Sequence, residues 1–387
     1  MKILIAPDKF KGTLSAAGVA AAIGRAARKK YPEAEIIEQP LADGGEGSLE
    51  LLQQLLPLKK RRLEVTGPLR RPVQAEYLLG EGKAYIEIAQ AAGLQHVPVP
   101  RRNPGKTTTI GVGMLIEDAI ARGANDIYLF LGGSATNDGG AGMAAALGYR
   151  FFGDRTEDFV PTGDSLQWVK HIDQLEVIPT LKDVRFTAVC DVDNPLLGAS
   201  GATFTYGEQK GAAVIDLPDL ERNMAVFAER INAALNLDVR TLAGAGAAGG
   251  LGAGCVAFLG AGLRPGIDVL MEVVGFADLV RGADMVITGE GKIDGQTIHG
   301  KVVSGVARAA RAAGVPKVIA FCGRQEVTTA DIKAMGLSSV HALLDLSSMT
   351  LSDAMYRTEA SLESLVSLRL HELIHGRHRG PNKRLIK

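Results

Sequence analysis

The two ends of the chain carry a regular alternation of short apolar runs with helical patterns, and this feature constrains the fold most. A short apolar run that stops at Pro, Gly or charged residues is typical of a buried strand, and apolar residues at helical spacing mark the helices that cover it. The expected strands are residues 2–6, 34–38, 284–288, 317–322 and 340–344, and the expected helices are 15–30, 44–56, 301–313, a helix from 329 and 352–375. Strands that alternate with helices predict a parallel sheet.

The middle of the chain follows a different pattern. Residues 63–88 contain closely spaced strand signals around the turn Gly80-Glu81-Gly82, which indicates antiparallel pairing. Beyond them we expect a helix at 111–122, a strand at 126–131 and mixed structure to about residue 275.

Because the alternation resumes after this middle segment, we predict an α/β fold in which one domain interrupts another. The first is a flavodoxin-like, doubly wound parallel sheet domain made of residues 1–60 plus 281–387. The second is an inserted mixed α/β domain, residues 61–280.

The composition excludes several classes of protein. Lys plus Arg and Asp plus Glu number 43 each, so no net field would draw the chain to nucleic acid or an anionic membrane. No stretch approaches the roughly 20 apolar residues of a membrane-spanning helix, and no signal-peptide pattern follows Met1. Cys190, Cys255 and Cys322 lie far apart in apolar runs and are expected to be free thiols. We therefore expect a cytoplasmic protein.

Charged residues gather in the segments that follow three of the predicted strands. Asp8, Lys9 and Lys11 follow the first strand, residues 43–47 follow the second, and residues 289–295 follow the third. Because the carboxyl ends of parallel strands share one edge of a sheet, we expect these segments to lie together. Lysines for phosphate charge, helix N-terminal amides for an anion, and carboxylates for Mg²⁺ or proton removal are what phosphoryl transfer requires.

Each of these segments also has a purely structural interpretation. Asp43 and Glu46 fit an Asp-x-x-Glu capping box, which needs no ligand. The other two segments fit a solvated loop and a plain connection from strand to helix.

Two further candidates lie in the predicted insertion. Residues 132–142 are rich in glycine and follow an apolar strand, and their backbone N–H groups with Ser134 and Thr136 could hold phosphates; the alternative is a turn that allows close helix packing. Asp191 and Asp193 would point to one side if their segment is a strand, which suits one divalent cation or a base; the alternative is turn-forming Asp.

Three short motif matches are weak evidence for the sites that they would otherwise indicate. Residues 371–375 match H-E-x-x-H, but an acidic third zinc ligand is missing after them. Residues 244–249 match G-x-G-x-x-G, but glycines continue beyond the motif, which favours close helix packing. Residues 295–301 match G-x-x-x-x-G-K, but Val302 stands where a P-loop has Ser or Thr.

Taken in order, these motifs resemble the bacterial glycerate kinase family. The segments that carry the resemblance are residues 6–13, 42–47, 132–142, 190–196, 209–212 and 288–294. The likeness runs from residue 1 to about 375, and only the basic ending, residues 377–387, has no match. The resemblance implies a kinase with ATP and Mg²⁺ as cofactors and D-glycerate as the phosphoryl acceptor. Members like this sequence generally give 2-phosphoglycerate.

The resemblance and the loop positions together give a hypothesis for the site. We expect catalytic roles for Lys11, Asp191 and Asp294, and Mg²⁺ at Asp191 and Asp193. The residues expected to contact the substrate are Asp8, Lys9, Asp43, Gly44, Gly45 and Glu46. Those expected to contact the ATP phosphates are Gly132, Gly133, Ser134, Thr136, Asn137, Gly289, Gly291 and Lys292. Asp191 or Asp294 would take the hydroxyl proton or bind Mg²⁺. The alternatives are a kinase for another small hydroxy acid and a non-catalytic metabolite sensor, and a homo-oligomer stays open.

Overall fold

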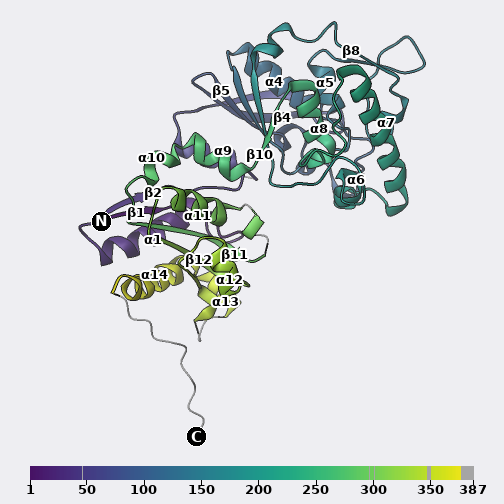
Figure 1. Ribbon diagram of the computed structural model, residues 1–387. Helices are drawn as coiled ribbons and strands as arrows, with labels where there is room; N and C mark the ends of the chain where they lie inside the picture. The colour runs from purple at the N-terminus through teal and green to yellow at the C-terminus, as the bar shows by residue number, and fades with distance from the viewer. Residues whose placement is uncertain (46, 296, 300, 347–349, 376–387) are drawn as a thin grey trace. The chain divides into compact units, whose positions relative to one another are not determined.

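The computed structural model describes residues 1–45, 47–295, 297–299, 301–346 and 350–375, with the side chains of residues 299 and 371–375 left out (Figure 1). The chain forms two compact units: a first unit of Met1–Asp43 with Leu270–Lys387, and a second unit of Gly44–Val269. The protein is an α/β protein with one all-parallel and one mixed sheet. The domain boundaries near residues 60 and 280 stay a prediction.

The first unit contains a five-stranded, all-parallel sheet in the order β13-β12-β11-β1-β2. Its strands are β1 (Lys2–Ile5), β2 (Glu35–Glu38), β11 (Met285–Ile293), β12 (Lys317–Gln325) and β13 (Ser339–Ala342). Its helices are α1 (Ala16–Lys30), α10 (Phe276–Val280), α11 (Val302–Ala312), α12 (Thr329–Ala334), α13 (Leu351–Tyr356) and α14 (Thr358–His375), with 3-10 turns η7 (Thr297–His299) and η8 (Leu343–Asp345). The alternation at the two ends of the chain therefore folds into the parallel sheet that it predicts.

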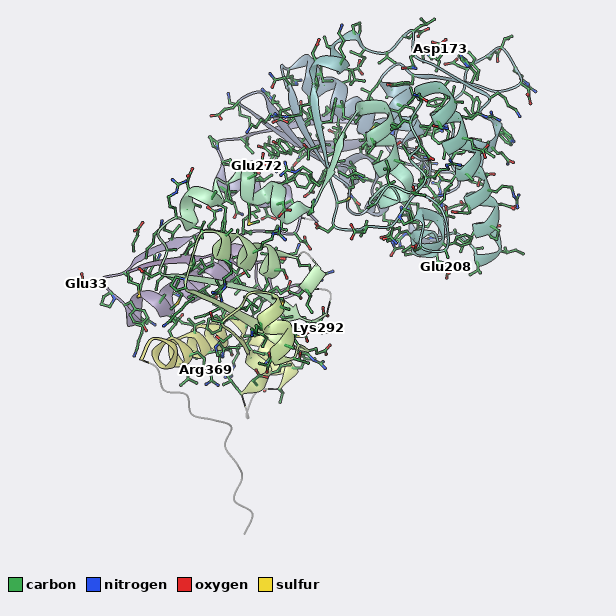
Figure 2. All side chains as sticks on the ribbon, in the orientation of Figure 1. Glu33, Asp173, Glu208, Glu272, Lys292 and Arg369 are labelled. Atoms are coloured by element: carbon green, nitrogen blue, oxygen red, sulfur yellow. The ribbon has the colours of Figure 1, made fainter. Side chains whose placement is uncertain are left out.

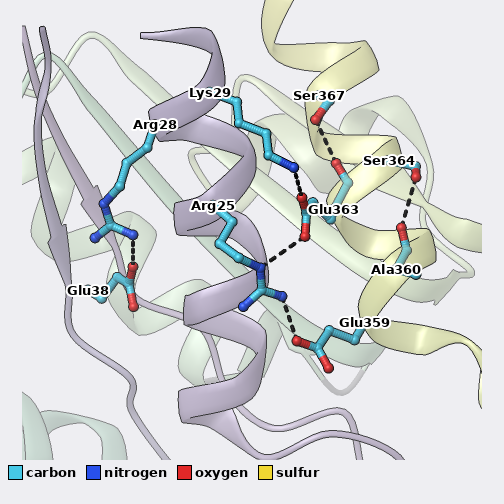
Figure 3. Close-up of polar contacts among 9 residues, drawn as sticks. All are labelled: Arg25, Arg28, Lys29, Glu38, Glu359, Ala360, Glu363, Ser364 and Ser367. Atoms are coloured by element: carbon cyan, nitrogen blue, oxygen red, sulfur yellow. Dashed lines mark hydrogen bonds and ion pairs between the residues drawn. The ribbon is translucent and has the colours of Figure 1, made fainter. Parts of the chain in front are cut away.

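Helix α1 packs against α14, which closes the end of the described chain onto its beginning (Figure 3). Ile23, Leu362 and Val366 belong to the apolar core of this unit. At the rim, Glu363 pairs with Arg25 Nε at 3.0 Å and with Lys29 Nζ at 2.6 Å. Helix α14 is thus held in this unit by apolar contacts in the core and by ion pairs at the rim.

Strand β11 is longer than its sequence indicates. Residues 289–293 were expected to form a loop, but they continue the strand and pair in register with residues 321–325 of β12. Glycine permits this close pairing, because a Cβ on Gly289 would lie 2.2 Å from Phe321 O. Gly289 therefore serves strand pairing rather than a loop.

The second unit contains a six-stranded mixed sheet in the order β10-β9-β6-β5-β4-β3. Strands β3 (Lys59–Thr66), β4 (Pro72–Gly80) and β5 (Lys83–Glu87) are antiparallel, as the sequence predicted, and β6 (Asp126–Phe130), β9 (Arg185–Val189) and β10 (Gly262–Arg264) continue the sheet in parallel. A separate antiparallel pair is formed by β7 (Arg150–Phe152) and β8 (His171–Asp173).

The helices of the second unit surround one large apolar core. They are α2 (Ser48–Leu55), α3 (Ala89–Ala92), α4 (Ile110–Ala121), α5 (Ala141–Ala146), α6 (Ala202–Tyr206), α7 (Leu217–Leu235) and α8 (Ala247–Leu259), with 3-10 turns η1 (Leu94–His96), η2 (Val99–Arg101), η3 (Leu166–Trp168), η4 (Pro179–Asp183), η5 (Glu208–Lys210) and η6 (Val214–Asp216); α9 (Gly266–Val273) spans the change between units. Helix α2 packs on β4 and β5, although the alternation had assigned it to the parallel sheet. None of the helices, as far as the structure describes them, is long and apolar enough to cross a membrane.

Candidate active site

Three carboxyl groups lie near one another at the carboxyl ends of the strands in the first unit. Asp8 follows β1, and its backbone N–H donates to Gly289 O at 2.8 Å, which ties it to β11. Glu290 lies within β11 itself, and Asp43 follows β2. The Asp8 and Glu290 residues are only 7% and 6% exposed.

The buried position of these groups shifts their proton affinity. The pKa of Asp8 is raised to about 7, chiefly because burial disfavours the charged form and then because Asp43 lies nearby. The pKa of Glu290 is also raised to about 7, chiefly by burial, although Thr297 Oγ1 donates a hydrogen bond to Glu290 Oε1. A carboxyl group that titrates near neutral pH is suited to accept a proton from a hydroxyl group.

Cationic groups surround the same edge. Lys9 is half-buried and Lys11 is exposed. Lys292, labelled in Figure 2, pairs with Asp294 at 3.1 Å and with Glu326 at 2.8 Å. Its charge is therefore already balanced by two carboxylates at the surface of the unit. A mostly apolar pocket of about 240 Å³ lies at this edge and is lined by Phe10, Lys11, Thr13, Gly291, Lys292, Gly323, Arg324, Leu343, Leu344, Leu351, Ala354, Met355 and Thr358.

The second unit has its own pocket, of about 430 Å³, beyond the ends of β6 and β9. It is lined by Gly44, Gly45, Leu94, Leu131, Gly132, Gly133, Ser134, Val189, Cys190, Asp191, Val192, Tyr206, Gln209, Lys210, Ala247 and Ala248. Gly44 adopts φ +87°, and a Cβ on it would lie 2.8 Å from Gly266 Cα, so glycine is required there. The predicted glycine-rich segment and residues 44–45 therefore do line a common pocket.

Asp138 holds the glycine-rich segment in place. Its fully buried carboxylate accepts hydrogen bonds from Thr109 N and Thr109 Oγ1, each at 2.8 Å, and from Gly140 N at 3.2 Å and Gly142 N at 3.3 Å. Burial raises the pKa of Asp138, while these donors favour its charged form. In the described part of the chain, Thr136 Oγ1 and Asn137 Oδ1 are buried without a hydrogen-bond partner.

Lys210 reaches the same segment from η5 and is only 4% exposed. Its Nζ donates to Ser134 Oγ at 2.7 Å and to Thr136 O at 2.9 Å. Burial lowers the pKa of Lys210 to about 7, against the attraction of Asp138. A buried lysine at the wall of a pocket is a recognised kind of functional residue.

The arrangement at Asp191 differs from the one expected. Strand β9 ends at Val189, so the alternation that would place Asp191 and Asp193 on one side does not apply. Both residues are exposed, and Asp191 Oδ1 accepts from Gly266 N at 2.7 Å. Across the described residues, no group of three or more His, Cys, Asp or Glu side chains is placed to hold a metal ion.

Comparison with known proteins decides the family. A family model described as the glycerate kinase family matches residues 3–372. The chain belongs to the glycerate kinase family. The resemblance seen in the sequence and the expected enzyme class, a glycerate kinase, are thereby confirmed, and the family implies use of ATP.

Individual relatives agree along nearly the whole chain. A protein named glycerate kinase from Halalkalibacterium halodurans is 43% identical over 363 residues, covering 93% of this chain and 95% of that one. A protein named glycerate 2-kinase from Escherichia coli K12 is 42% identical over 346 residues, covering 89% and 91%. The crystal structure of a protein described as glycerate kinase 2 from Salmonella typhimurium LT2 has a TM-score of 0.85 at 40% identity, covering 97% and 99%.

The predicted site residues fall into two groups, one in each unit. The first unit holds Asp8, Lys9, Lys11, Asp43, Gly289, Gly291, Lys292 and Asp294, and the second holds Gly44, Gly45, Gly132, Gly133, Ser134, Thr136, Asn137, Asp191 and Asp193. Glu46 lies outside the described residues. The functional role of each of these residues stays a prediction.

Three charged groups with unusual surroundings were not singled out from the sequence: Asp138, Lys210 and Glu290. Glu290 lies in the charged segment 289–295 and Asp138 in the glycine-rich segment 132–142, whereas Lys210 lies only in a segment that carries the family resemblance.

The weak motifs behave as expected where the structure describes them. Residues 244–249 follow no strand, so a dinucleotide-binding unit is missing there. Lys301 is the N-cap residue of α11, while residues 296 and 300 of the P-loop match lie outside the described residues. The side chains of His371, Glu372 and His375 also lie outside them.

Proposed function

We propose that this chain transfers the γ-phosphoryl group of ATP to the 2-hydroxyl group of D-glycerate and so forms 2-phosphoglycerate. The observation that carries the proposal is the near full-length match to the glycerate kinase family, which includes a relative named glycerate 2-kinase at 42% identity. The proposal also places the protein in the cytoplasm.

The first unit offers the groups that would act on the hydroxyl proton. Asp8 and Glu290 combine burial with a pKa of about 7, so each can be ionised at neutral pH and still accept a proton. Asp294 lies close to Glu290 and remains the candidate named from the sequence. Lys9 and Lys11 would contribute positive charge toward the phosphates or the glycerate carboxylate.

A magnesium ion would supply charge neutralisation for the ATP phosphates. The exposed carboxylates of Asp191 and Asp193 fit Mg²⁺ that keeps most of its water and phosphate ligands, because Mg²⁺ in kinases is commonly held by one or two carboxylates. Loss of turnover in excess EDTA, with recovery on adding Mg²⁺, tests this part of the proposal. Asp191→Asn should raise the Mg²⁺ concentration needed for half-maximal rate, whereas Asp173→Asn, at the end of β8 and not among the residues that line the pocket of the second unit, should not.

The fold of the first unit is proposed to be doubly wound and flavodoxin-like. The five parallel strands follow the order 2-1-3-4-5 when numbered within this unit, which is the flavodoxin-like order. In such sheets, ligands bind beyond the carboxyl ends of the strands. Asp8 and Asp43 follow the ends of β1 and β2, and Glu290 lies near them within β11.

The decisive experiment is ATP turnover with D-glycerate, Mg²⁺ and the purified chain, with the product identified by phosphorus NMR. The expected result is 2-phosphoglycerate, with much slower turnover of L-glycerate. Formation of 3-phosphoglycerate would refute the position of transfer. No consumption of ATP with either enantiomer would refute the substrate, and a screen of other small hydroxy acids would then follow.

The proton-accepting group is identified by variants that keep side-chain shape. Asp8→Asn, Glu290→Gln and Asp294→Asn each remove one carboxylate. The residue that accepts the proton should lower kcat by about 10²-fold or more with little change in KM. If all three variants keep near-normal kcat, the assignment to this edge is wrong.

A further inference from the structure

We propose that the pocket of the second unit is an oxyanion-binding site in which Lys210 supplies the positive charge. The oxyanion would be a phosphate of ATP or the carboxylate of glycerate, and both are bound by the same chemistry. The inference rests on the proposed function for the identity of these ligands.

The lining of the pocket points to an anion. Of the described residues that line it, Lys210 carries the one positive charge. Gly132, Gly133 and Ser134 form the wall that Lys210 touches, and a glycine-rich wall lets backbone N–H groups approach a ligand closely. Ala248 lines the same pocket and holds φ +55°, a left-handed conformation that is uncommon for residues other than glycine and is enriched at functional sites.

The hydrogen bonds of Lys210 leave capacity for a ligand. A protonated lysine has three donors, and two of them are used by Ser134 Oγ and Thr136 O. Both acceptors are neutral, and among the described residues Lys210 forms no ion pair. A lysine that is buried for structural reasons is normally paired with a carboxylate. An anion in the pocket would supply that missing partner.

The electrostatics agree with this geometry. Burial lowers the pKa of Lys210 to about 7, so at pH 8 the empty pocket would hold a mostly neutral amine. Asp138 attracts the charged form from the glycine-rich segment, and Cys190, Asp191 and Tyr206 line the same pocket. A bound oxyanion favours the charged form strongly, so binding should be accompanied by uptake of a proton.

Isothermal titration calorimetry of the whole chain at pH 8 tests this inference directly. ATP with Mg²⁺ and D-glycerate are titrated separately, each in two buffers with different enthalpies of ionisation. A group with a pKa near 7 is about nine-tenths deprotonated at pH 8, so the ligand that meets Lys210 should take up about 0.9 proton. Proton uptake with ATP assigns the phosphates, and uptake with D-glycerate assigns the carboxylate. No proton uptake with either ligand overturns the proposal.

Variants of Lys210 test whether the proton taken up on ligand binding is bound by this residue. In Lys210→Met the proton uptake should vanish, and KM for the same ligand should rise by about tenfold or more. Lys210→Arg keeps the charge and should bind without proton uptake. Lys182→Met removes an exposed lysine of the same unit and should match the wild type in both measurements. Proton uptake that persists in Lys210→Met would refute the role of Lys210.

The inference and the proposed function can fail separately. If the wild type makes 2-phosphoglycerate but neither titration takes up a proton, the anion site is wrong while the activity stands. If the wild type does not turn over glycerate, the ATP titration still decides whether Lys210 binds phosphate. Because Asp8 and Glu290 also have pKa values of about 7, the titrations are repeated with Asp8→Asn and Glu290→Gln. Proton uptake that persists in both variants supports Lys210 even where a change at Lys210 itself impairs folding, and uptake that is lost in either variant refutes its role.

Discussion

Asp138 allows the strength of the buried hydrogen-bond network around the glycine-rich segment to be measured. Asp138 Oδ2 accepts from Thr109 N, Thr109 Oγ1 and Gly142 N, and Oδ1 accepts from Gly140 N. Alanine at this position would leave these donors buried without an acceptor. An unsatisfied buried donor costs about 1–3 kcal/mol.

The free energy of unfolding that Asp138→Ala removes is smaller than the sum of the penalties for the individual unsatisfied donors. The two glycine bonds are long, the Thr109 hydroxyl group can turn elsewhere, and removal of a buried charge returns its desolvation cost. We therefore expect a loss of about 2–4 kcal/mol in the free energy of unfolding of this unit. In Asp138→Asn the amide oxygen can still face Thr109, and only the hydrogen bond from Gly140 N is lost. We therefore expect a loss of about 1 kcal/mol in the free energy of unfolding.

Urea unfolding followed by fluorescence of Trp168 measures this cost. Trp168 is the one tryptophan of the chain and lies in the same unit as Asp138. The two variants should differ clearly in their urea midpoints at an unchanged slope. Equal destabilisation by Asp138→Ala and Asp138→Asn would refute the argument, because it would show that the charge and not the set of hydrogen bonds stabilises the segment.

Three further predictions test packing, surface charge and pH. Gly142→Ala should destabilise the fold by about 1–3 kcal/mol in urea unfolding, because its Cβ would lie 2.7 Å from Ile110 N, whereas Gly262→Ala, with open space around it, should not. Glu363→Gln should lower the free energy of unfolding by about 1 kcal/mol, and this difference should shrink in 1 M salt; an unchanged difference would contradict an ionic origin. Burial raises the pKa of Asp8 to about 7 in the folded protein, above its value in the unfolded chain. The free energy of unfolding that Asp8 contributes is therefore fully present below the unfolded pKa and is lost as pH rises through 7. The free energy of unfolding of Asp8→Asn should depend less on pH between 5 and 8 than that of the wild type.

Local pattern predicted the parallel sheet but not the full length of its strands. The run at residues 284–288 is apolar and was recognised, whereas residues 289–293 carry Gly and charge and looked like a loop. They form strand because β12 continues beside them and lets Glu290 and Lys292 pair with Cys322 and Arg324. The partner strand is distant in sequence, so its effect is invisible to local propensity.

The same limit explains why Lys210 and Asp138 were not identified as site residues. Lysine and aspartate are usually exposed, and nothing in their immediate neighbours indicates burial. Only the folded chain brings Lys210 to Ser134, and Asp138 to Thr109. In contrast, the glycine-rich segment itself could be predicted, because the spacing of its glycines is local.

Asp8, Glu290 and Lys210 together predict the pH dependence of the reaction. A carboxyl group with a pKa of about 7 accepts a proton only when ionised, so kcat/KM should rise with pH through 7. Lys210 binds an oxyanion only when charged, so kcat/KM should fall as pH rises through 7. Two opposed titrations at the same pKa give a narrow optimum near pH 7, with a roughly threefold decrease one pH unit to either side. Lys210→Arg should remove the alkaline decrease and keep the acid one, and a flat profile from pH 6 to 9 in the wild type would show that neither titration governs the reaction.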